Sequence, residues 1–237
     1  MIQAVSLRKS FDGHQALNGL TFSAGDGAIT GLVGPNGSGK TTTLRLITGL
    51  FRPNSGQVLV DGIDPTLDPM SARLRIGALT DGLGNYPRLT THEHIWYFGQ
   101  LRGMSAAELE PRTRFLLDLF DMGEIADRRA QGFSLGERMK LALARAMVND
   151  PPNILLDEPA NGLDVRSARA LRTLLERLRD AGKCVLLCSH LMAEVSLVCD
   201  SVIVIARGQA VAQGSPAELV RANNARSLEE AFVNLTE

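Results

Sequence analysis

Eight consecutive residues of this chain, from Gly34 to Thr41, have the spacing G-x-x-x-x-G-K-[ST] of a phosphate-binding loop. Glycines in such a loop let backbone N–H groups turn towards phosphate oxygens, and the N-terminus of the following helix adds a partial positive charge. An apolar stretch precedes the loop and a helical pattern follows it, as this chemistry requires. We therefore predict that a nucleoside triphosphate is held by Gly34, Pro35, Asn36, Gly37, Ser38, Gly39, Lys40, Thr41 and Thr42.

The last residues of the loop have separate predicted roles. The Lys40 ammonium is expected to reach the β- and γ-phosphates, and the Thr41 hydroxyl is expected to ligate Mg²⁺. The alternative is a glycine-rich turn with a solvated lysine, which the complete match in a strand–helix context disfavours. The loop alone does not distinguish a kinase, a GTPase or a transport ATPase, because unrelated functions share it.

Two carboxylates follow an apolar stretch much later in the chain. Asp157 and Glu158 come directly after residues 153–156, which are predicted to form a buried strand. A carboxylate at the end of such a strand can hold Mg²⁺ through water, and a neighbouring one can polarise the attacking water. Each residue taken alone would be an ordinary surface acid. With the phosphate loop upstream, Asp157 is predicted to be a metal ligand and Glu158 a catalytic residue.

Ser134 has two compatible interpretations. It is a good N-cap for the helix predicted after it, which has apolar residues at helical spacing. A helix N-terminus is also an anion site, so Ser134 could bind a γ-phosphate presented by another molecule.

His190 follows the predicted strand 184–187, and ligands bind at the carboxyl edge of such sheets. We predict that it hydrogen-bonds the γ-phosphate. Its neighbours Cys184 and Cys188 raise the alternative of a metal site. Zinc centres usually need about four ligands at other spacings, so buried thiols are favoured.

Short apolar stretches alternate with amphipathic ones, which predicts an α/β fold. Between residues 81 and 148 the pattern is mostly helical, and Thr90, Ser105 and Ser134 each stand three residues before a glutamate, the capping-box spacing. We interpret residues 1–237 as a single domain, with a helical subdomain at 81–148 inserted in the sheet core and a helical tail at 215–237. The predicted strands are 28–33, 57–60, 75–79, 153–156, 184–187 and 201–205.

The composition limits the possible classes of function. The chain has 237 residues and a net charge of −1, so it has no strongly basic field and we expect no nucleic-acid partner. Apolar runs such as 202–206 are far shorter than the roughly 20 residues that span a bilayer. We expect no signal peptide, since the N-terminus lacks the required pattern, and the sparse cysteines fit a cytoplasmic location.

The motifs above follow one another in the order and spacing typical of one family, and the chain resembles the ATP-binding subunit of an ABC transporter along nearly its whole length. The motifs that carry the resemblance are GPNGSGKTT at 34–42, FSLGE at 133–137, NILLDEP at 153–159, NGLD at 161–164 and SH at 189–190. The resemblance implies an α/β P-loop NTPase fold with a mixed sheet core, an N-terminal antiparallel β region and the inserted helical subdomain. It also implies ATP and Mg²⁺ as cofactors.

Further roles follow from the resemblance. It implies a head-to-tail dimer, a homodimer or a paired ATPase subunit, in which Ser134 and Gly136 of one copy contact the ATP held at Lys40 of the other. It implies that Phe11 stacks on adenine and that Asp164 lies at the dimer contact. The partner would be an integral-membrane permease, with this chain attached peripherally to the cytoplasmic face of the membrane.

The sequence departs from the family pattern at two places. The signature LSGGQ reads Phe133-Ser134-Leu135-Gly136-Glu137, which adds bulk at Leu135 and negative charge at Glu137. The glutamine that couples ATP to the permease corresponds to Asp81, which we predict contacts Mg²⁺ or its water.

Residues 80–90 and the ending 227–232 are similar to those of bacterial exporter subunits, including the ATPase of sodium-exporting ABC systems. An exporter is therefore expected, and sodium is one possible cargo. The main alternative is a soluble ABC-type ATPase that acts on ribosomes or nucleic acid. A small-molecule kinase using the same loop does not explain the signature or His190.

Overall fold

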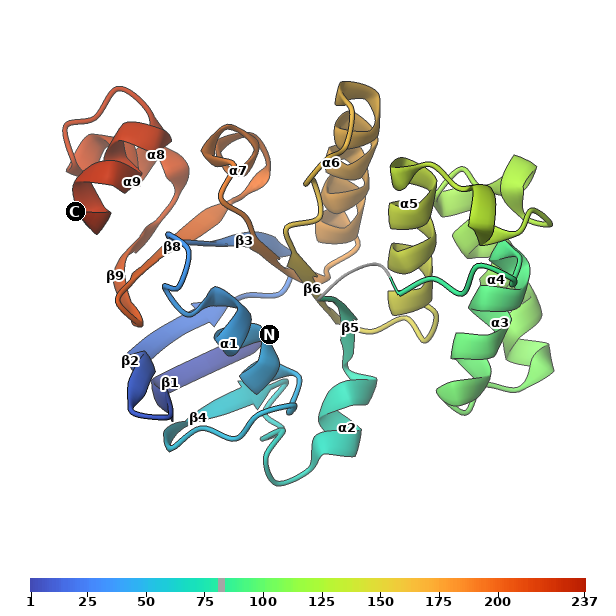
Figure 1. The fold of residues 1–237 in the computed structure, drawn as a ribbon, viewed down its shortest axis with the longest axis horizontal. Helices are drawn as coiled ribbons and strands as arrows, with labels where there is room; N and C mark the ends of the chain where they lie inside the picture. Colours follow the sequence, from blue (N-terminus) through green and yellow to red (C-terminus); the bar gives the residue numbers. More distant parts are fainter. Residues whose placement is uncertain (81–83) are drawn as a thin grey trace.

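The strands of this protein form two sheets, which the computed structural model describes over residues 1–80 and 84–237 (Figure 1). The smaller sheet is antiparallel and has the strand order β2-β1-β4. The larger sheet has the order β5-β6-β7-β3-β8-β9, with β9 antiparallel to β8 and the other neighbouring strands parallel. The chain is thus an α/β protein with a mixed sheet core and an N-terminal antiparallel region, as predicted. The strands are β1 (Ile2–Phe11), β2 (His14–Ala24), β3 (Ala28–Val33), β4 (Ser55–Val60), β5 (Ile76–Leu79), β6 (Asn153–Asp157), β7 (Cys184–Cys188), β8 (Ser201–Ala206) and β9 (Gln209–Gly214).

The parallel strands in the middle of the larger sheet are apolar and buried, because both faces of the sheet are covered. Side chains alternate between the faces. Leu155 and Leu186 pack in one core with Leu44 of α1 (Lys40–Ile47) and the antiparallel sheet. Ile154 and Val185 point into a second core, which α6 (Val165–Asp180) and the helices of residues 91–146 cover.

The helices are α1 (Lys40–Ile47), α2 (Pro69–Leu74), α3 (Thr91–Leu101), α4 (Ala106–Leu119), α5 (Leu135–Ala146), α6 (Val165–Asp180), α7 (Met192–Val198), α8 (Pro216–Ala222) and α9 (Leu228–Thr236). In chain order α3, α4 and α5 lie between β5 and β6, and they gather at one end of the molecule (Figure 1, green to yellow). Helices α8 and α9 lie at the opposite end. No helix in the described ranges is long and apolar enough to cross a membrane.

Local sequence signals start these helices. The predicted capping boxes at Thr90, Ser105 and Ser134 are all present. In each box the hydroxyl accepts a hydrogen bond from the backbone N–H of the glutamate three positions on, and the glutamate carboxylate accepts one from the backbone N–H of the capping residue. Each cap contributes about 1 kcal/mol to helix stability. Ser215 begins α8 in the same way, with Pro216 at the first helical position.

The strand order places the candidate residues at one edge of the larger sheet. Strands β6, β7 and β3 are neighbours and parallel, so their carboxyl ends meet at that edge. The phosphate loop follows β3, Asp157 ends β6, and Ser189 follows β7.

Candidate functional site

Glycines shape the loop between β3 and α1. A Cβ on Gly34 would lie 2.4 Å from the backbone oxygen of Ile205, so a larger residue does not fit there. Gly39 has φ +109° and a Cβ on it would lie 2.5 Å from Leu17 Cδ2. Gly39 is the N-cap of α1 and provides no side-chain cap, so first-turn N–H groups are available to an anion.

The Lys40 side chain is buried inside the loop. Its Nζ donates hydrogen bonds to the backbone oxygens of Gly34, at 2.6 Å, and Pro35, at 3.2 Å. These contacts keep the ammonium within the loop that the motif predicts to surround an anion.

The predicted nucleotide-binding residues line a cavity of about 520 Å³. This volume suits a small-molecule cofactor. Most of the predicted loop residues line this cavity, whereas Gly34, Pro35 and Ser38 belong to the loop but are not among the lining residues. His14 and Ala16 also line the cavity, and the sequence analysis did not identify them. The lining residues are Phe11, His14, Ala16, Asn36, Gly37, Gly39, Lys40, Thr41, Thr42, Asp157 and Glu158.

The Thr41 hydroxyl lies 3.4 Å from Asp157 Oδ2 at one side of this cavity. Residues 116 positions apart in the chain therefore present two oxygen donors together. Hard oxygen ligands of this kind, completed by phosphates and water, are what Mg²⁺ prefers, so the residues fit that ion. Asp81, the third predicted metal residue, lies outside the described residues. Within the described ranges no cluster of three or more His, Cys, Asp or Glu side chains could hold a metal ion, and the three cysteines are buried thiols.

Glu158 has an unusual backbone conformation and a close histidine partner. Its φ is +49°, and its N–H donates to the oxygen of Cys188 at the end of β7. One carboxylate oxygen lies 2.8 Å from His190 Nδ1, and the other accepts from the His190 backbone N–H at 3.4 Å. Non-glycine residues in this conformation cost free energy and cluster at functional sites. The pair fixes the direction of the Glu158 carboxylate, whereas His190 itself is exposed and does not line the cavity.

Phe11, which is predicted to stack on adenine, lines the same cavity as the phosphate loop. Its ring packs edge-on against Phe51, with centroids 5.3 Å apart, and Lys9 Nζ lies 5.0 Å from the Phe11 centroid. The hairpin that pairs Phe11 with His14 explains why both residues line one cavity.

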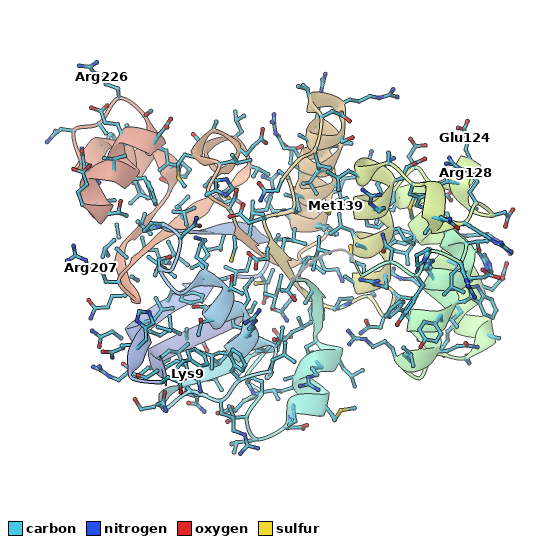
Figure 2. All side chains as sticks on the ribbon, in the orientation of Figure 1. Lys9, Glu124, Arg128, Met139, Arg207 and Arg226 are labelled. Atoms are coloured by element: carbon cyan, nitrogen blue, oxygen red, sulfur yellow. The ribbon has the colours of Figure 1, made fainter. Side chains whose placement is uncertain are left out.

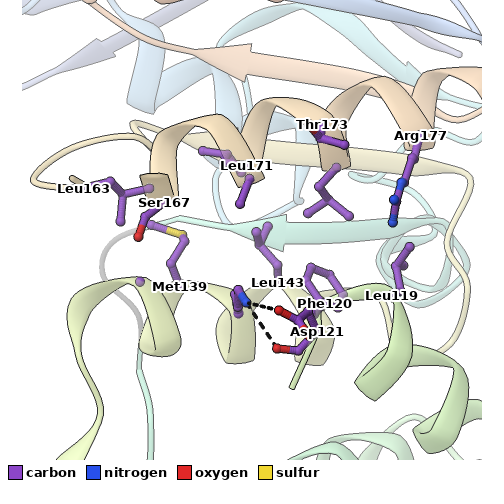
Figure 3. A pocket seen from close by; sticks show the side chains of 14 residues that line it. Leu119, Phe120, Asp121, Met139, Leu143, Leu163, Ser167, Leu171, Thr173 and Arg177 are labelled. Atoms are coloured by element: carbon purple, nitrogen blue, oxygen red, sulfur yellow. Dashed lines mark hydrogen bonds and ion pairs between the residues drawn. The ribbon is translucent and has the colours of Figure 1, made fainter. Parts of the chain in front are cut away.

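Ser134 and Gly136 do not line the nucleotide cavity among the described residues. They start α5, where Gly136 faces α6 so closely that a Cβ would lie 2.7 Å from Ser167 Oγ. Ser167 in turn bonds Asp164, the N-cap of α6. A cleft of about 250 Å³ separates α5 from α6, with Met139, Leu143 and Leu171 pointing into it (Figure 3). Within a single chain, therefore, Ser134 and Gly136 lie outside the cavity that the phosphate loop lines.

Comparison with known proteins agrees with this arrangement. The ABC transporter family model matches residues 17–161. The ABC transporter ATP-binding protein NatA of Bacillus subtilis is 38% identical over 221 residues, which are 93% of this chain and 90% of that protein. The lipopolysaccharide export system ATP-binding protein LptB of Escherichia coli K12 is 33% identical over 93% of this chain and 92% of its own length.

Solved structures are similar over the same length. A solved ATP-binding subunit of an ABC transporter has a TM-score of 0.90 at 29% identity, with 100% of both chains covered. A bacterial ABC transporter cassette solved as a dimer has a TM-score of 0.81 at 26% identity, covering 91% of this chain and 98% of that one. The phosphate loop, the Asp157–Glu158 pair and these matches together show that the chain belongs to the ABC transporter family, as an ATP-binding subunit with ATPase activity.

Proposed function

We propose that this ATPase dimerises around two Mg-ATP molecules and drives a separate membrane permease, and that the assembled transporter is an exporter. The observation that supports this best is one cavity lined by Lys40, Thr41, Asp157 and Glu158, residues that two distant segments bring together. ATP is the fuel, and the permease supplies the path through the membrane. The chain would then lie on the cytoplasmic face of the membrane, attached through its partner. Residues 81–148 would act as one helical unit within the single domain 1–237, and residues 215–237 as a tail.

The predicted site residues have separate proposed roles in hydrolysis. The loop Gly34–Thr42 binds the phosphates, and Phe11 stacks on adenine. Thr41 and Asp157 hold Mg²⁺, with Asp81 as a further contact, and the ion neutralises phosphate charge when bound. Glu158 polarises the attacking water, and His190 holds the Glu158 carboxylate in place and contacts the γ-phosphate.

Ser134 and Gly136 of a second copy would complete each site. The separation of these residues from the phosphate loop of their own chain supports this role, as does the dimeric arrangement of the similar bacterial cassette. Asp164 would lie at the contact between the two copies.

The Mg²⁺ assignment predicts a specific loss of metal affinity. Asp157→Asn is expected to raise the Mg²⁺ concentration needed for half-maximal ATP turnover by about tenfold or more, because the amide is a weaker ligand for a hard cation. Titrating MgCl₂ at fixed ATP measures the change. Asp180→Asn, on an exposed acid at the end of α6 that pairs with Arg179, is the control and should leave the titration unchanged. An unaltered Mg²⁺ requirement in the Asp157 variant would remove this residue from the metal site.

An apolar groove of about 640 Å³ is the proposed docking surface for the permease. It lies between the end of α1, α2, β5 and the end of α3, and the large side chains Leu50, Met70 and Leu101 around it are exposed by 59%, 68% and 64%. Arg73 and Arg102 border the groove and are held by bonds to backbone oxygens. An apolar permease segment that carries an acidic side chain matches this surface in both hydrophobicity and charge.

Leu101→Asp is therefore expected to release the protein from membranes that contain its permease, while leaving ATP turnover of the purified protein within about twofold. The control is Leu197→Asp on α7, because Leu197 is 61% exposed and lies outside the groove. Membrane fractionation after gentle lysis measures the difference. Retention of the Leu101 variant on membranes would contradict the docking surface.

Native-level tagging and co-purification test the function as a whole. Recovery of a multi-spanning membrane protein is expected, whereas recovery of ribosomes or nucleic acid would favour the soluble alternative. Export is proposed because relatives are named for the export of Nod factor and lipopolysaccharide. Sodium stays a narrower prediction from the loop sequences, and ²²Na⁺ efflux from vesicles that contain the complex tests it.

A further inference from the structure

The signature turn of this chain contains a carboxylate next to its phosphate-binding serine. Glu137 Oε2 accepts the Ser134 backbone N–H at 2.7 Å, and Ser134 Oγ accepts the Glu137 N–H at 3.2 Å. The Ser134 backbone bond keeps the pKa of Glu137 below its ordinary value, with a smaller contribution from Arg128. The carboxylate is therefore ionised at neutral pH, and it belongs to the same capping box as the Ser134 hydroxyl.

An isolated negative charge at this position would repel a triphosphate. Coulomb repulsion between unit charges about 5 Å apart remains substantial at the effective dielectric of a protein surface. The capping box occupies the N–H groups of Ser134 and Glu137, so an incoming anion relies on the Ser134 hydroxyl and the first-turn N–H groups of Leu135 and Gly136. The turn therefore needs a nearby positive charge if it is to face ATP.

Arg128 provides that charge. Its Nη1 donates to Glu137 Oε1 at 3.0 Å, so Glu137 uses one oxygen for Ser134 and the other for Arg128. The Arg128 guanidinium also lies over the Phe133 ring, 5.4 Å from its centroid. Its backbone N–H bonds the oxygen of Ile125, which fixes the loop before the signature. Arg128 lies on the outer side of the helical end of the molecule, and its side chain is half exposed (Figure 2).

We propose that Arg128 is a positioning residue for the ATP site of the partner copy: it neutralises Glu137 and holds the signature turn so that Ser134 can approach the triphosphate. This inference rests on the proposed dimer. A surface ion pair contributes little to folding, so the role concerns ATP-driven association and not stability.

A double-mutant cycle in the Glu158→Gln background tests the proposal, because that variant is expected to accumulate the ATP-bound dimer. The four proteins carry no further change, Arg128→Gln, Glu137→Gln, or both. Glutamine retains the capping box, so Glu137→Gln removes the charge and leaves the helix start intact. Light scattering measures the Mg-ATP concentration for half-maximal dimerisation, and thermal unfolding reports on stability.

Arg128→Gln is expected to raise the half-maximal ATP concentration about tenfold at low salt, with a smaller effect at high salt because ions screen exposed charges. Adding Glu137→Gln should restore the value to within about twofold, and Arg128→Lys should retain most of the parent behaviour. All melting temperatures should agree closely.

Two results would overturn the proposal while leaving the dimer itself in place. One is an unchanged ATP requirement in Arg128→Gln, and the other is a double variant as defective as the single one. A parent protein that stays monomeric at saturating Mg-ATP would instead contradict the proposed dimer, and with it this role of Arg128.

Discussion

Replacement of Glu158 by glutamine is expected to lower ATP turnover at least ~10³-fold, which corresponds to about 4 kcal/mol of activation free energy. The amide matches the carboxylate in shape but is far weaker at polarising water. Glu158 lines the candidate nucleotide cavity together with Asp157, and His190 Nδ1 lies 2.8 Å from its carboxylate, which supports the proposed role. ATP binding should persist, because the phosphate loop is unchanged.

Two measurements check this expectation. Phosphate release gives the turnover, and light scattering with saturating Mg-ATP should show that the slow variant forms a dimer. Glu194→Gln is the matched control: Glu194 is about as exposed as Glu158 and pairs with Arg172 at 3.0 Å, away from the cavity. Near-normal turnover in the Glu158 variant would remove this residue from catalysis.

Gly39→Ala is expected to abolish measurable ATP binding, a loss of about 100-fold or more. The added Cβ would lie 2.5 Å from Leu17 Cδ2 and 2.8 Å from the backbone oxygen of Ala16, at a position where φ is +109°. The leucine side chain can move, but the Ala16 backbone cannot do so cheaply, so the loop must shift. A displacement of about 1 Å is enough to cost 10²-fold in a site that depends on geometry.

Gly182→Ala separates backbone strain from this steric effect. Gly182 also has positive φ, at +80°, but no atom lies within 4 Å of the position of its Cβ among the described residues. That variant should lose about 1 kcal/mol of stability and bind ATP normally. Isothermal titration with ATP measures both variants. Normal binding by Gly39→Ala would show that the loop tolerates the methyl group and that the close contact does not govern its shape.

Features encoded in contiguous residues were predictable. The phosphate loop, the strand before it and the capping boxes depend on neighbours within a few positions, so their residue types carry the information. The predicted strands 153–156 and 184–187 each extend one residue further in the structure, because hydrogen bonding to adjacent strands continues to Asp157 and Cys188. The roles of Phe11 and of Asp81, which lies outside the described residues, stay predictions.

Features that depend on distant segments were not predictable from any local pattern. His14 and Ala16 line the cavity because β2 pairs with β1, and Phe51 supports Phe11 from a loop forty residues away. The positive φ of Glu158 and its bond to the end of β7 follow from the pairing of β6 with β7. The bond from Arg128 to Glu137 required the loop before α5 to fold back on the helix start.

The sequence by itself determined the predicted chemistry of this protein, since the groups expected to bind phosphate and ligate a metal are specified by residue type and short spacing. Only the tertiary structure decided which groups meet. The parallel order of β6, β7 and β3 brings Thr41 within 3.4 Å of Asp157 across 116 residues, whereas α5 keeps Ser134 out of the same cavity. Strand order and helix packing arise from long-range burial of apolar faces, and that information is distributed over the whole chain.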